Sequence, residues 1–237
     1  TEIPAHLLVI GGGPIGIELA QAHSHLGARV SVLEIFHIMP KDDPELVNTV
    51  RQQLILDGVD MYENVTIVRI EKTKNGLCVV ISKSGVEQLV QGSHLLVAAG
   101  RQPNINRLAL EKGEIMYSPK GIKVDAHLST SNKKNFAIGD VVGGLQFTHI
   151  AGYHAGIVIK NALFHLPAKV HYQFVPWVTF TSPEVSQVGL NELQARKLHG
   201  DKVRVLRWPY AESDRAQVEG ATKGIIKAVT TYKGKIL

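Results

Sequence analysis

The chain has 237 residues, 44% of them hydrophobic and 20% charged, which is typical of a globular protein with room for one or two domains. No apolar stretch approaches the ~18 residues of a membrane-spanning helix. The lysines and arginines behind the net charge of +5 are scattered, so neither a membrane nor a nucleic acid is an expected partner. The single cysteine, Cys78, excludes an internal disulfide and favours a reducing, cytoplasmic setting.

Residues 7–34 read LLVIGGGPIGIELAQAHSHLGARVSVLE and have the pattern of a dinucleotide-binding βαβ unit. An apolar strand runs into a glycine turn, a helical pattern follows, and a second strand ends on an acid. Gly11 permits the sharp turn, Gly13 leaves the backbone open to a pyrophosphate, and Gly16 lets the helix lie close to the strand. The amides that open the helix are then expected to face the phosphates.

Glu34 indicates which dinucleotide the site prefers. A carboxylate at the end of the second strand accepts hydrogen bonds from an adenosine ribose 2′-hydroxyl and repels a 2′-phosphate. Residues 35–39 hold no arginine that could receive such a phosphate. The sequence therefore predicts NAD(H) rather than NADP(H). A glycine motif alone or an acid alone would be weak evidence, but the strand, turn, helix and acid occur together.

A helix and a set of strands are predicted after Glu34. Asp43 is expected to cap a helix that begins at Pro44 and ends at Gly58. An Asn-Gly pair at residues 75–76 predicts a hairpin turn. Strands are predicted over residues 59–61, 65–71, 77–82 and 88–91. This order indicates a β-meander inserted before the last parallel strand of the sheet.

The last strand of this domain is predicted over residues 93–98, read as SHLLVA. It is apolar on both faces, so we expect a buried parallel strand. The strand would deliver Gly100 and Arg101 to the carboxyl edge of the sheet, where open α/β sheets bind ligands.

Residues 102–130 are polar, are broken by prolines and glycines, and indicate a crossover between domains. FAIGD at residues 136–140 then predicts a strand that ends on Asp140. Taken alone, this pattern is more typical of a simple strand exit, but the carboxylate is also able to bind a polyol such as the ribityl chain of a flavin. An amphipathic helix is predicted from Thr148, and its N-terminus would stabilise negative charge at the pyrimidine edge of a flavin. His149 lies in its first turn, and a lone histidine is by default a packing or surface residue.

The remaining residues have a mixed helix and strand pattern without a motif of their own, which indicates a structural or interface module. Strands are predicted over 170–180, 185–189, 203–208 and 224–231, a short helix over 191–198, and a loop over 209–220. The chain starts without a methionine and stops within a predicted strand, so we expect both ends to be cuts within a longer protein.

Four spaced stretches together resemble the flavin-dependent pyridine nucleotide–disulfide oxidoreductases, and within them the dihydrolipoamide dehydrogenase and mercuric reductase group. The stretches are GGGPIGIELA (11–20), LLVAAGRQPN (95–104), FAIGDVVGG (136–144) and VPWVTFTSPEVSQVGL (175–190), in the order of the family. The resemblance implies an α/β fold in three parts. These are a Rossmann-type NAD-binding domain with an inserted β-meander (1–101), the C-terminal part of an FAD-binding domain (102–169) and part of an α+β dimerisation domain (170–237).

The resemblance also implies roles for individual residues. Glu18 resembles a glutamate that pairs with a lysine close to the flavin N5, and that lysine would lie upstream of this chain. Asp140 resembles the ribityl-binding aspartate, and Val188 a residue whose backbone faces the nicotinamide. The implied NAD site comprises Gly11, Gly12, Gly13, Pro14, Ile15, Gly16, Glu34, Val65 near the adenosine, Gly100 and Arg101, and the implied FAD site comprises Gly139, Asp140, Gln146, Phe147, Thr148 and His149.

The activity that the resemblance implies is hydride transfer between NAD(H) and FAD, coupled in a full-length homodimer to a redox-active disulfide. The substrate would be a small molecule, a disulfide or a dithiol. The family's first FAD-binding glycine motif, its paired redox cysteines and its His–Glu pair lie outside this chain. We expect the chain as given to bind NADH better than NADPH and to hold FAD weakly or not at all.

Two other functions stay open at this stage. One is an NADH:acceptor flavoprotein without redox cysteines, and the other is a nucleotide-binding module without turnover. The substrate is open as well, because Glu34 favours the lipoamide dehydrogenases whereas residues 212–219, ESDRAQVE, are more similar to relatives of mercuric reductase.

Overall fold

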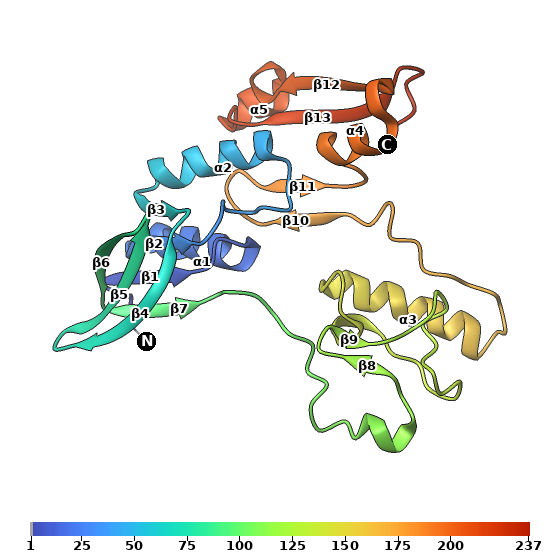
Figure 1. The fold of residues 1–237 in the computed structure, drawn as a ribbon. Coiled ribbons are helices and arrows are strands. Elements are labelled where there is room, and N and C mark those ends of the chain that lie inside the picture. The colour runs from blue at the N-terminus through green and yellow to red at the C-terminus, as the bar shows by residue number, and fades with distance from the viewer. Residues whose placement is uncertain (1) are drawn as a thin grey trace. The chain divides into compact units, whose positions relative to one another are not determined.

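The computed structural model describes residues 2–237, and the chain divides into two compact units (Figure 1). One unit comprises the residues up to Gly100 together with Pro176–Leu237, and the other comprises Arg101–Val175. The C-terminal module therefore packs with the predicted dinucleotide-binding domain. None of the helices in residues 2–237 is long and apolar enough to cross a membrane.

A four-stranded parallel sheet forms the centre of the first unit, with the order β3-β2-β1-β7. The strands are β1 (His6–Ile10), β2 (Arg29–Glu34), β3 (Val59–Glu63) and β7 (His94–Val97). Helices α1 (Pro14–His25) and α2 (Pro44–Leu56) pack on one face of this sheet, where Ile17, Val50 and Leu54 join the core. The predicted α/β, Rossmann-type arrangement is confirmed, and so is the Asp43 cap, whose side chain accepts from the amide of Glu45.

Strand β7 is half exposed, so the prediction of a strand buried on both faces is wrong. It pairs with β1 on one side, and residues 2–237 supply no strand for its other side. Val97 accordingly keeps 64% of its surface exposed. The predicted direction is confirmed, because β7 runs parallel to β1 and leads to Gly100 at the carboxyl edge of the sheet.

The inserted β-meander is confirmed as a three-stranded antiparallel sheet of β4 (Thr66–Thr73), β5 (Gly76–Lys83) and β6 (Val86–Gly92). It packs on the face of the parallel sheet opposite to α1 and α2. Leu8 and Leu33 point to this face, since side chains alternate along a strand, and they form a second core with Val79 and Ile81. Cys78 is buried within β5.

The second unit is built from short elements and one long helix, α3 (Thr148–Ala162). The short elements are a 3₁₀ turn at Leu110–Gly113, the strand pair β8 (Tyr117–Ser118) and β9 (Gly121–Ile122), and a 3₁₀ turn at Gly139–Val142. The predicted strand over residues 136–140 is wrong. Phe136 forms only an isolated bridge to Ser129, because residues 2–237 provide no longer partner, and the 3₁₀ turn begins at Gly139.

The C-terminal module contains two strand pairs and two helices. They are β10 (Trp177–Thr179), β11 (Val185–Gln187), α4 (Glu192–His199), β12 (Val203–Pro209), α5 (Asp214–Glu219) and β13 (Ile225–Thr231), with 3₁₀ turns at Gly200–Lys202 and Tyr210–Glu212. The strand predicted over 170–180 shrinks to three residues, because β10 pairs with β11 only from Trp177 to Thr179. The loop predicted over 209–220 contains α5, whose N-cap is Ser213.

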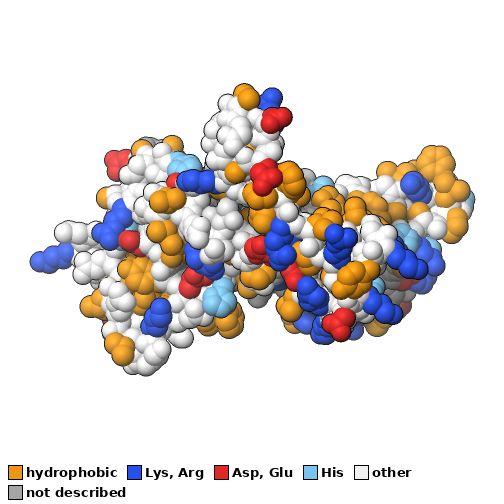
Figure 2. Space-filling model, turned by 90° about the horizontal axis from the view of Figure 1, so that it is seen from above, with side chains coloured by type: hydrophobic (Ala, Val, Ile, Leu, Met, Phe, Trp, Pro, Cys, Tyr) orange, Lys and Arg blue, Asp and Glu red, His pale blue; other side chains and the backbone are white. Residues whose placement is uncertain are grey.

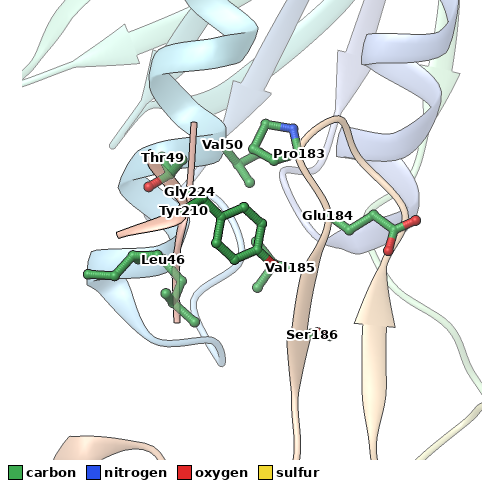
Figure 3. A pocket seen from close by; sticks show the side chains of 10 residues that line it. Leu46, Thr49, Val50, Pro183, Glu184, Val185, Ser186, Tyr210 and Gly224 are labelled. Atoms are coloured by element: carbon green, nitrogen blue, oxygen red, sulfur yellow. The ribbon is translucent and has the colours of Figure 1, made fainter. Parts of the chain in front are cut away.

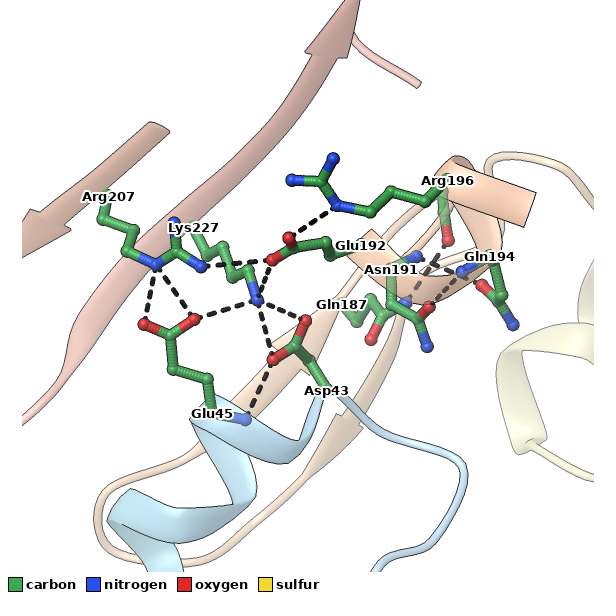
Figure 4. A network of polar contacts seen from close by, with 10 residues as sticks. Asp43, Glu45, Gln187, Asn191, Glu192, Gln194, Arg196, Arg207 and Lys227 are labelled. Carbon is green, nitrogen blue, oxygen red and sulfur yellow. Dashed lines mark hydrogen bonds and ion pairs between the residues drawn. The ribbon is translucent and has the colours of Figure 1, made fainter. Parts of the chain in front are cut away.

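A buried lysine joins this module to the dinucleotide-binding domain (Figure 4). The Nζ atom of Lys227 lies 2.8 Å from Asp43, 2.9 Å from Glu45 and 2.9 Å from Glu192, and 6% of its side chain is exposed. Arg207 adds bonds to Glu45 and Glu192. The N-terminus of α2 is thereby tied to β12, β13 and α4 through charged hydrogen bonds.

A small cavity of about 60 Å³ also lies where the C-terminal module packs on the dinucleotide-binding domain. It is bordered by α2, the segment before β11 and the loops that flank β12 and β13 (Figure 3). Leu46, Val50, Pro183, Val185 and Tyr210 lie around it. This volume suits water but not a dinucleotide, since sites for such ligands are several times larger. On the face seen in Figure 2, basic side chains are interspersed with acidic and hydrophobic ones.

Candidate cofactor-binding sites

The glycine turn after β1 has the geometry that its sequence predicts. Gly11 has φ +108°, and its amide donates to the carbonyl of Leu33 at 2.9 Å, which closes the turn against β2. A Cβ on Gly11 would collide with the carbonyl of Ala98, and a Cβ on Gly16 would collide with the carbonyl of Gly11. Both glycines are therefore required by the packing of α1 against the strand ends.

Gly13 serves a different purpose, because a Cβ there would meet no atom within 4 Å. It is the N-cap of α1, no side chain caps the helix, and Pro14 lacks an amide hydrogen. Within residues 2–237 the amides of Gly13, Ile15 and Gly16 have no hydrogen-bond partner. Open space in front of partnerless helix amides is what a diphosphate needs.

Glu34 lies beside this turn with its carboxylate held in place. Only 9% of the residue is exposed. Its Oε2 accepts from the amide of Gly12 at 2.5 Å, and its Oε1 accepts from the amide of Phe36 at 2.9 Å. A carboxylate has about four acceptor positions, so it can still accept from a sugar hydroxyl. The amide of Val65 donates to the Glu34 carbonyl, but its side chain is buried in the core, so Val65 offers only backbone to a nucleotide.

Two residues that sequence reasoning missed support the loop after Glu34. The amide of Ile38 donates to Glu63 Oε1 at 2.8 Å, and Arg51 forms a two-pronged bond to the same carboxylate. Burial alone would raise the pKa of Glu63, but these bonds outweigh it and hold the pKa below its ordinary value. The amide of Met39 also donates to Gly12, so the loop is tied to the glycine turn itself.

Helix α1 also holds the segment between β10 and β11. Glu18 Oε1 accepts from the amide of Phe180 at 2.8 Å. Gln21, buried and missed by sequence reasoning, accepts from the amide of Ser182 and donates to its carbonyl. The pairing of Glu18 with a lysine upstream of this chain stays a prediction. Val188, just after β11, is 55% exposed.

In the second unit, the predicted FAD residues gather around one turn. Arg101 donates to Asp140 Oδ2 at 2.5 Å and to the carbonyl of Gln146 at 3.0 Å. Within residues 2–237 the other carboxylate oxygen of Asp140, Oδ1, has no partner, so it can accept from a ligand hydroxyl. Gly139 has φ +67°, and a Cβ there would lie 3.0 Å from Ala151 on α3. Arg101 thus bonds to predicted FAD residues, while neighbouring Gly100 has φ +116° and borders open space.

The N-terminus of α3 adjoins this turn in the sequence and carries the last predicted FAD residues. Phe147 is its N-cap, and no side-chain hydrogen bond caps the helix. The rings of Phe147 and His149 stack with centroids 5.4 Å apart. Thr148 and His149 are exposed. No capping side chain therefore neutralises the positive end of the helix dipole.

Fold and geometry together define a class of protein. A parallel sheet whose first βα turn is a glycine loop with partnerless amides, and whose second strand ends on a carboxylate beside that loop, is a Rossmann-type dinucleotide-binding domain. The family described as pyridine nucleotide-disulphide oxidoreductase matches residues 1–155, and its dimerisation domain matches residues 175–237. The chain belongs to this family, which confirms the resemblance drawn from the four motifs.

Individual relatives agree with this assignment. A dihydrolipoyl dehydrogenase from Bacillus subtilis (strain 168) is 32% identical over 96% of this chain and 49% of that protein. A mercuric reductase from Staphylococcus aureus is 36% identical over 96% of this chain and 42% of that protein. The Cu(II) complex of the HOCl-induced flavoprotein disulfide reductase RclA from Escherichia coli superposes with a TM-score of 0.89 and 33% identity, over 98% of this chain and 54% of that one. The chain thus spans about half the length of these relatives.

Proposed function

We propose that the complete protein is an FAD-dependent oxidoreductase that transfers a hydride between NAD(H) and FAD and couples this transfer to a redox-active disulfide. Membership of the pyridine nucleotide-disulphide oxidoreductase family supports the reaction class. The observation that carries the proposal is the hydrogen bond from Gly12 to Glu34, which holds a carboxylate beside a glycine turn with partnerless helix amides.

NAD(H) suits this turn better than NADP(H). The amides of Gly13, Ile15 and Gly16 would bind the diphosphate, and Glu34 would accept from the adenosine ribose. Glu34 is buried and tied to two amides, so it cannot swing aside for a 2′-phosphate without leaving both donors unpaired. Two negative groups in one buried place repel each other strongly.

FAD suits the residues around Asp140. The free oxygen of Asp140 would accept from a ribityl hydroxyl, while Arg101 holds the other oxygen. The N-terminus of α3 would stabilise negative charge on the pyrimidine side of the ring, with Gln146, Phe147, Thr148 and His149 beside it. When bound, the flavin supplies reversible hydride chemistry towards the nicotinamide. Glu18 would help to orient the flavin near its N5 atom through its lysine partner.

The thiol chemistry needs cysteines from outside this chain. Cys78 is buried in β5 and is the only cysteine present, so it cannot form the redox pair. Relatives named dihydrolipoyl dehydrogenase, mercuric reductase and flavoprotein disulfide reductase suggest a disulfide, a dithiol or a metal ion as the group that exchanges electrons with the enzyme. We include in the proposal a homodimer formed through residues 170–237, an NAD-binding domain over 1–101, an FAD-binding part over 102–169 and a cytoplasmic location.

An anaerobic titration of the FAD-loaded complete protein with NADH tests the proposal. We expect NADH to bleach the flavin absorbance and a disulfide such as oxidised lipoamide to restore it. The Gly13→Ala variant is a matched control, because its Cβ would enter only the space reserved for the diphosphate. It should keep its flavin but need at least about tenfold more NADH for the same bleaching.

Three other outcomes have distinct meanings. Bleaching that only oxygen reverses would favour the alternative of an NADH:acceptor flavoprotein without redox cysteines. A flavin that NADH does not bleach would contradict the proposed hydride transfer. If the Gly13→Ala variant were bleached at the same NADH concentration as the wild type, the proposed diphosphate site would be contradicted.

A further inference from the structure

His154 is a buried histidine on α3 that the reaction proposed above does not use. The residue is 1% exposed. Its Nδ1 accepts a hydrogen bond from the amide of Gly139 at 3.1 Å, and its Nε2 lies 2.9 Å from the hydroxyl of Tyr172. One side chain therefore joins the long helix, the turn that carries Asp140 and the segment that follows the helix.

These contacts determine which form of the imidazole is present. A backbone amide can only donate, so Nδ1 must be an unprotonated acceptor. The neutral ring then carries its hydrogen on Nε2 and donates it to Tyr172. A second proton would have to sit on Nδ1, where it would face the N–H of Gly139. The charged form of His154 therefore cannot keep its bond to the turn.

The surroundings of the ring also disfavour the charged form. The titratable side chains that contact it are Tyr153 on the same helix, with ring centroids 6.2 Å apart, and Tyr172, with centroids 5.8 Å apart. The carboxylate of Asp140, in the turn, is bonded to Arg101. Within residues 2–237 no carboxylate is hydrogen-bonded to the ring, and burial lowers the pKa of His154.

The turn held by His154 has little room to move while the bond persists. Gly139 packs so closely on α3 that a Cβ would come within 3.0 Å of Ala151. Asp140 follows directly, and its position depends on that of Gly139. Loss of the Gly139 bond would leave a buried amide unpaired, which favours a shift of the turn towards water or another acceptor.

We propose that neutral His154 is a positioning residue that holds the Gly139–Asp140 turn in the conformation that binds FAD, and that protonation of its Nδ1 releases the turn and weakens FAD binding. This inference rests on the FAD site of the proposed function. Because the neutral form is the bonded one, the effect is absent at high pH and grows as the pH falls below the ordinary pKa of histidine, about 6.5.

The test is the FAD dissociation constant of the complete protein measured between about pH 8 and pH 5. For the wild type we expect the constant to rise about tenfold on acidification. In His154→Gln the amide oxygen can still accept from Gly139 and the amide nitrogen can still donate to Tyr172, but neither titrates, so the profile should be flat. His165→Gln makes the same change at an exposed histidine of the same unit and should keep the wild-type rise.

A His154→Phe variant removes the acceptor, and it should hold FAD at least about tenfold more weakly at every pH. If it does not fold, as judged by circular dichroism, the profile of His154→Gln decides alone. Two outcomes would overturn the role of His154 and leave the FAD site intact. In one, the FAD dissociation constant of His154→Gln rises on acidification as much as that of the wild type; in the other, the wild type binds FAD with the same dissociation constant at every pH. A wild-type protein that holds no FAD at any pH would instead overturn the proposed FAD site, and this inference with it.

Discussion

The glycine turn at residues 11–16 and the turn at Gly139–Asp140 are built in different ways. Each has a glycine with positive φ, +108° at Gly11 and +67° at Gly139. The first turn is held by backbone hydrogen bonds from Gly11 to Leu33 and from Met39 to Gly12, together with one side chain, that of Glu34. The second turn has one backbone hydrogen bond, from Gly143 to Asp140, and depends further on two side chains, Arg101 and His154.

This difference separates what short sequence patterns can specify from what tertiary contacts specify. The first turn needs glycines at fixed spacing between a strand and a helix, and this pattern is local in the sequence. The second turn needs an arginine 39 residues earlier and a histidine 15 residues later, and neither belongs to a recognisable spacing. Because one of these side chains is a histidine, the second turn can also respond to pH near neutrality.

We predict the strongest effect, a loss of stability, at the Lys227 cluster, which also depends on contacts between side chains distant in the sequence. Lys227→Met would leave Asp43, Glu45 and Glu192 close together, with the half-exposed Arg207 and Arg196 as their counter-charges. We expect the free energy of unfolding to fall by about 3 kcal/mol, as when one partner of a buried ion pair is removed. Denaturant unfolding of the variant measures this change.

Lys133→Met is the matched control, because Lys133 also pairs with an aspartate, Asp125, but is 72% exposed. It should cost less than about 0.5 kcal/mol. Equal losses for the two variants would contradict the structural importance given to burial of the Lys227 cluster.

The next prediction separates the two kinds of glycine within the first turn. Gly16→Ala places a Cβ against the carbonyl of Gly11, so we expect about 2 kcal/mol lower unfolding free energy together with loss of NADH binding. Gly13→Ala enters open space and should change stability by less than about 0.5 kcal/mol while still weakening NADH binding. Thermal unfolding and calorimetric titration with NADH check both. A destabilised Gly13→Ala protein would mean that this glycine is structural as well.

The side-chain-held turn can be weakened at its other anchor. Arg101→Ala removes the bond to Asp140, and we expect FAD affinity to fall about tenfold with little change in unfolding free energy, because both side chains are about half exposed. Arg29→Ala, which breaks a similarly exposed pair with Asp60 in the other unit, should leave FAD affinity unchanged. Flavin fluorescence of the filtrate after dilution measures release. Retention of FAD by Arg101→Ala equal to that of the wild type would argue against Arg101 as an anchor.

The smallest predicted effect is the acid response of the Lys227 cluster. Hydrogen bonds from Arg207 and then Lys227 lower the pKa of Glu45 to about 2. A lowered folded-state pKa stabilises the protein above the ordinary pKa of the group, and this stabilisation is lost as the pH falls towards about 2. Glu45→Gln should therefore lose stability slightly at neutral pH and show a shallower decline in acid. Glu212→Gln, at an exposed glutamate, should follow the wild-type acid profile in denaturant titrations.

Much of the first unit could be predicted because its signals are local. The glycine turn, the Asp43 cap and the Asn-Gly hairpin lie within a few residues of the structure that they specify. The wrong predictions concern strands whose length depends on a partner. The segment 136–140 and β10 are extended in sequence pattern but find few residues to pair with, and β7 lies at an edge.

The site residues divide in the same way. Glu34 could be placed from its position at the end of β2, and the structure puts its carboxylate against the glycine turn. Gln21, Glu63 and His154 could not be predicted, because each bonds to a residue distant in the sequence or to a backbone group exposed by another turn. For Gln21 and His154, a polar residue in the apolar stripe of a helix was the only signal available.

Coenzyme selectivity depends directly on whether the first turn and Glu34 together bind NAD(H). The measurement is the pair of dissociation constants for NADH and NADPH on the complete protein at one salt concentration. We predict that NADH binds at least about tenfold more tightly than NADPH and that Glu34→Ala narrows this ratio. Equal affinity for the two nucleotides, or a ratio that Glu34→Ala leaves unchanged, would contradict it.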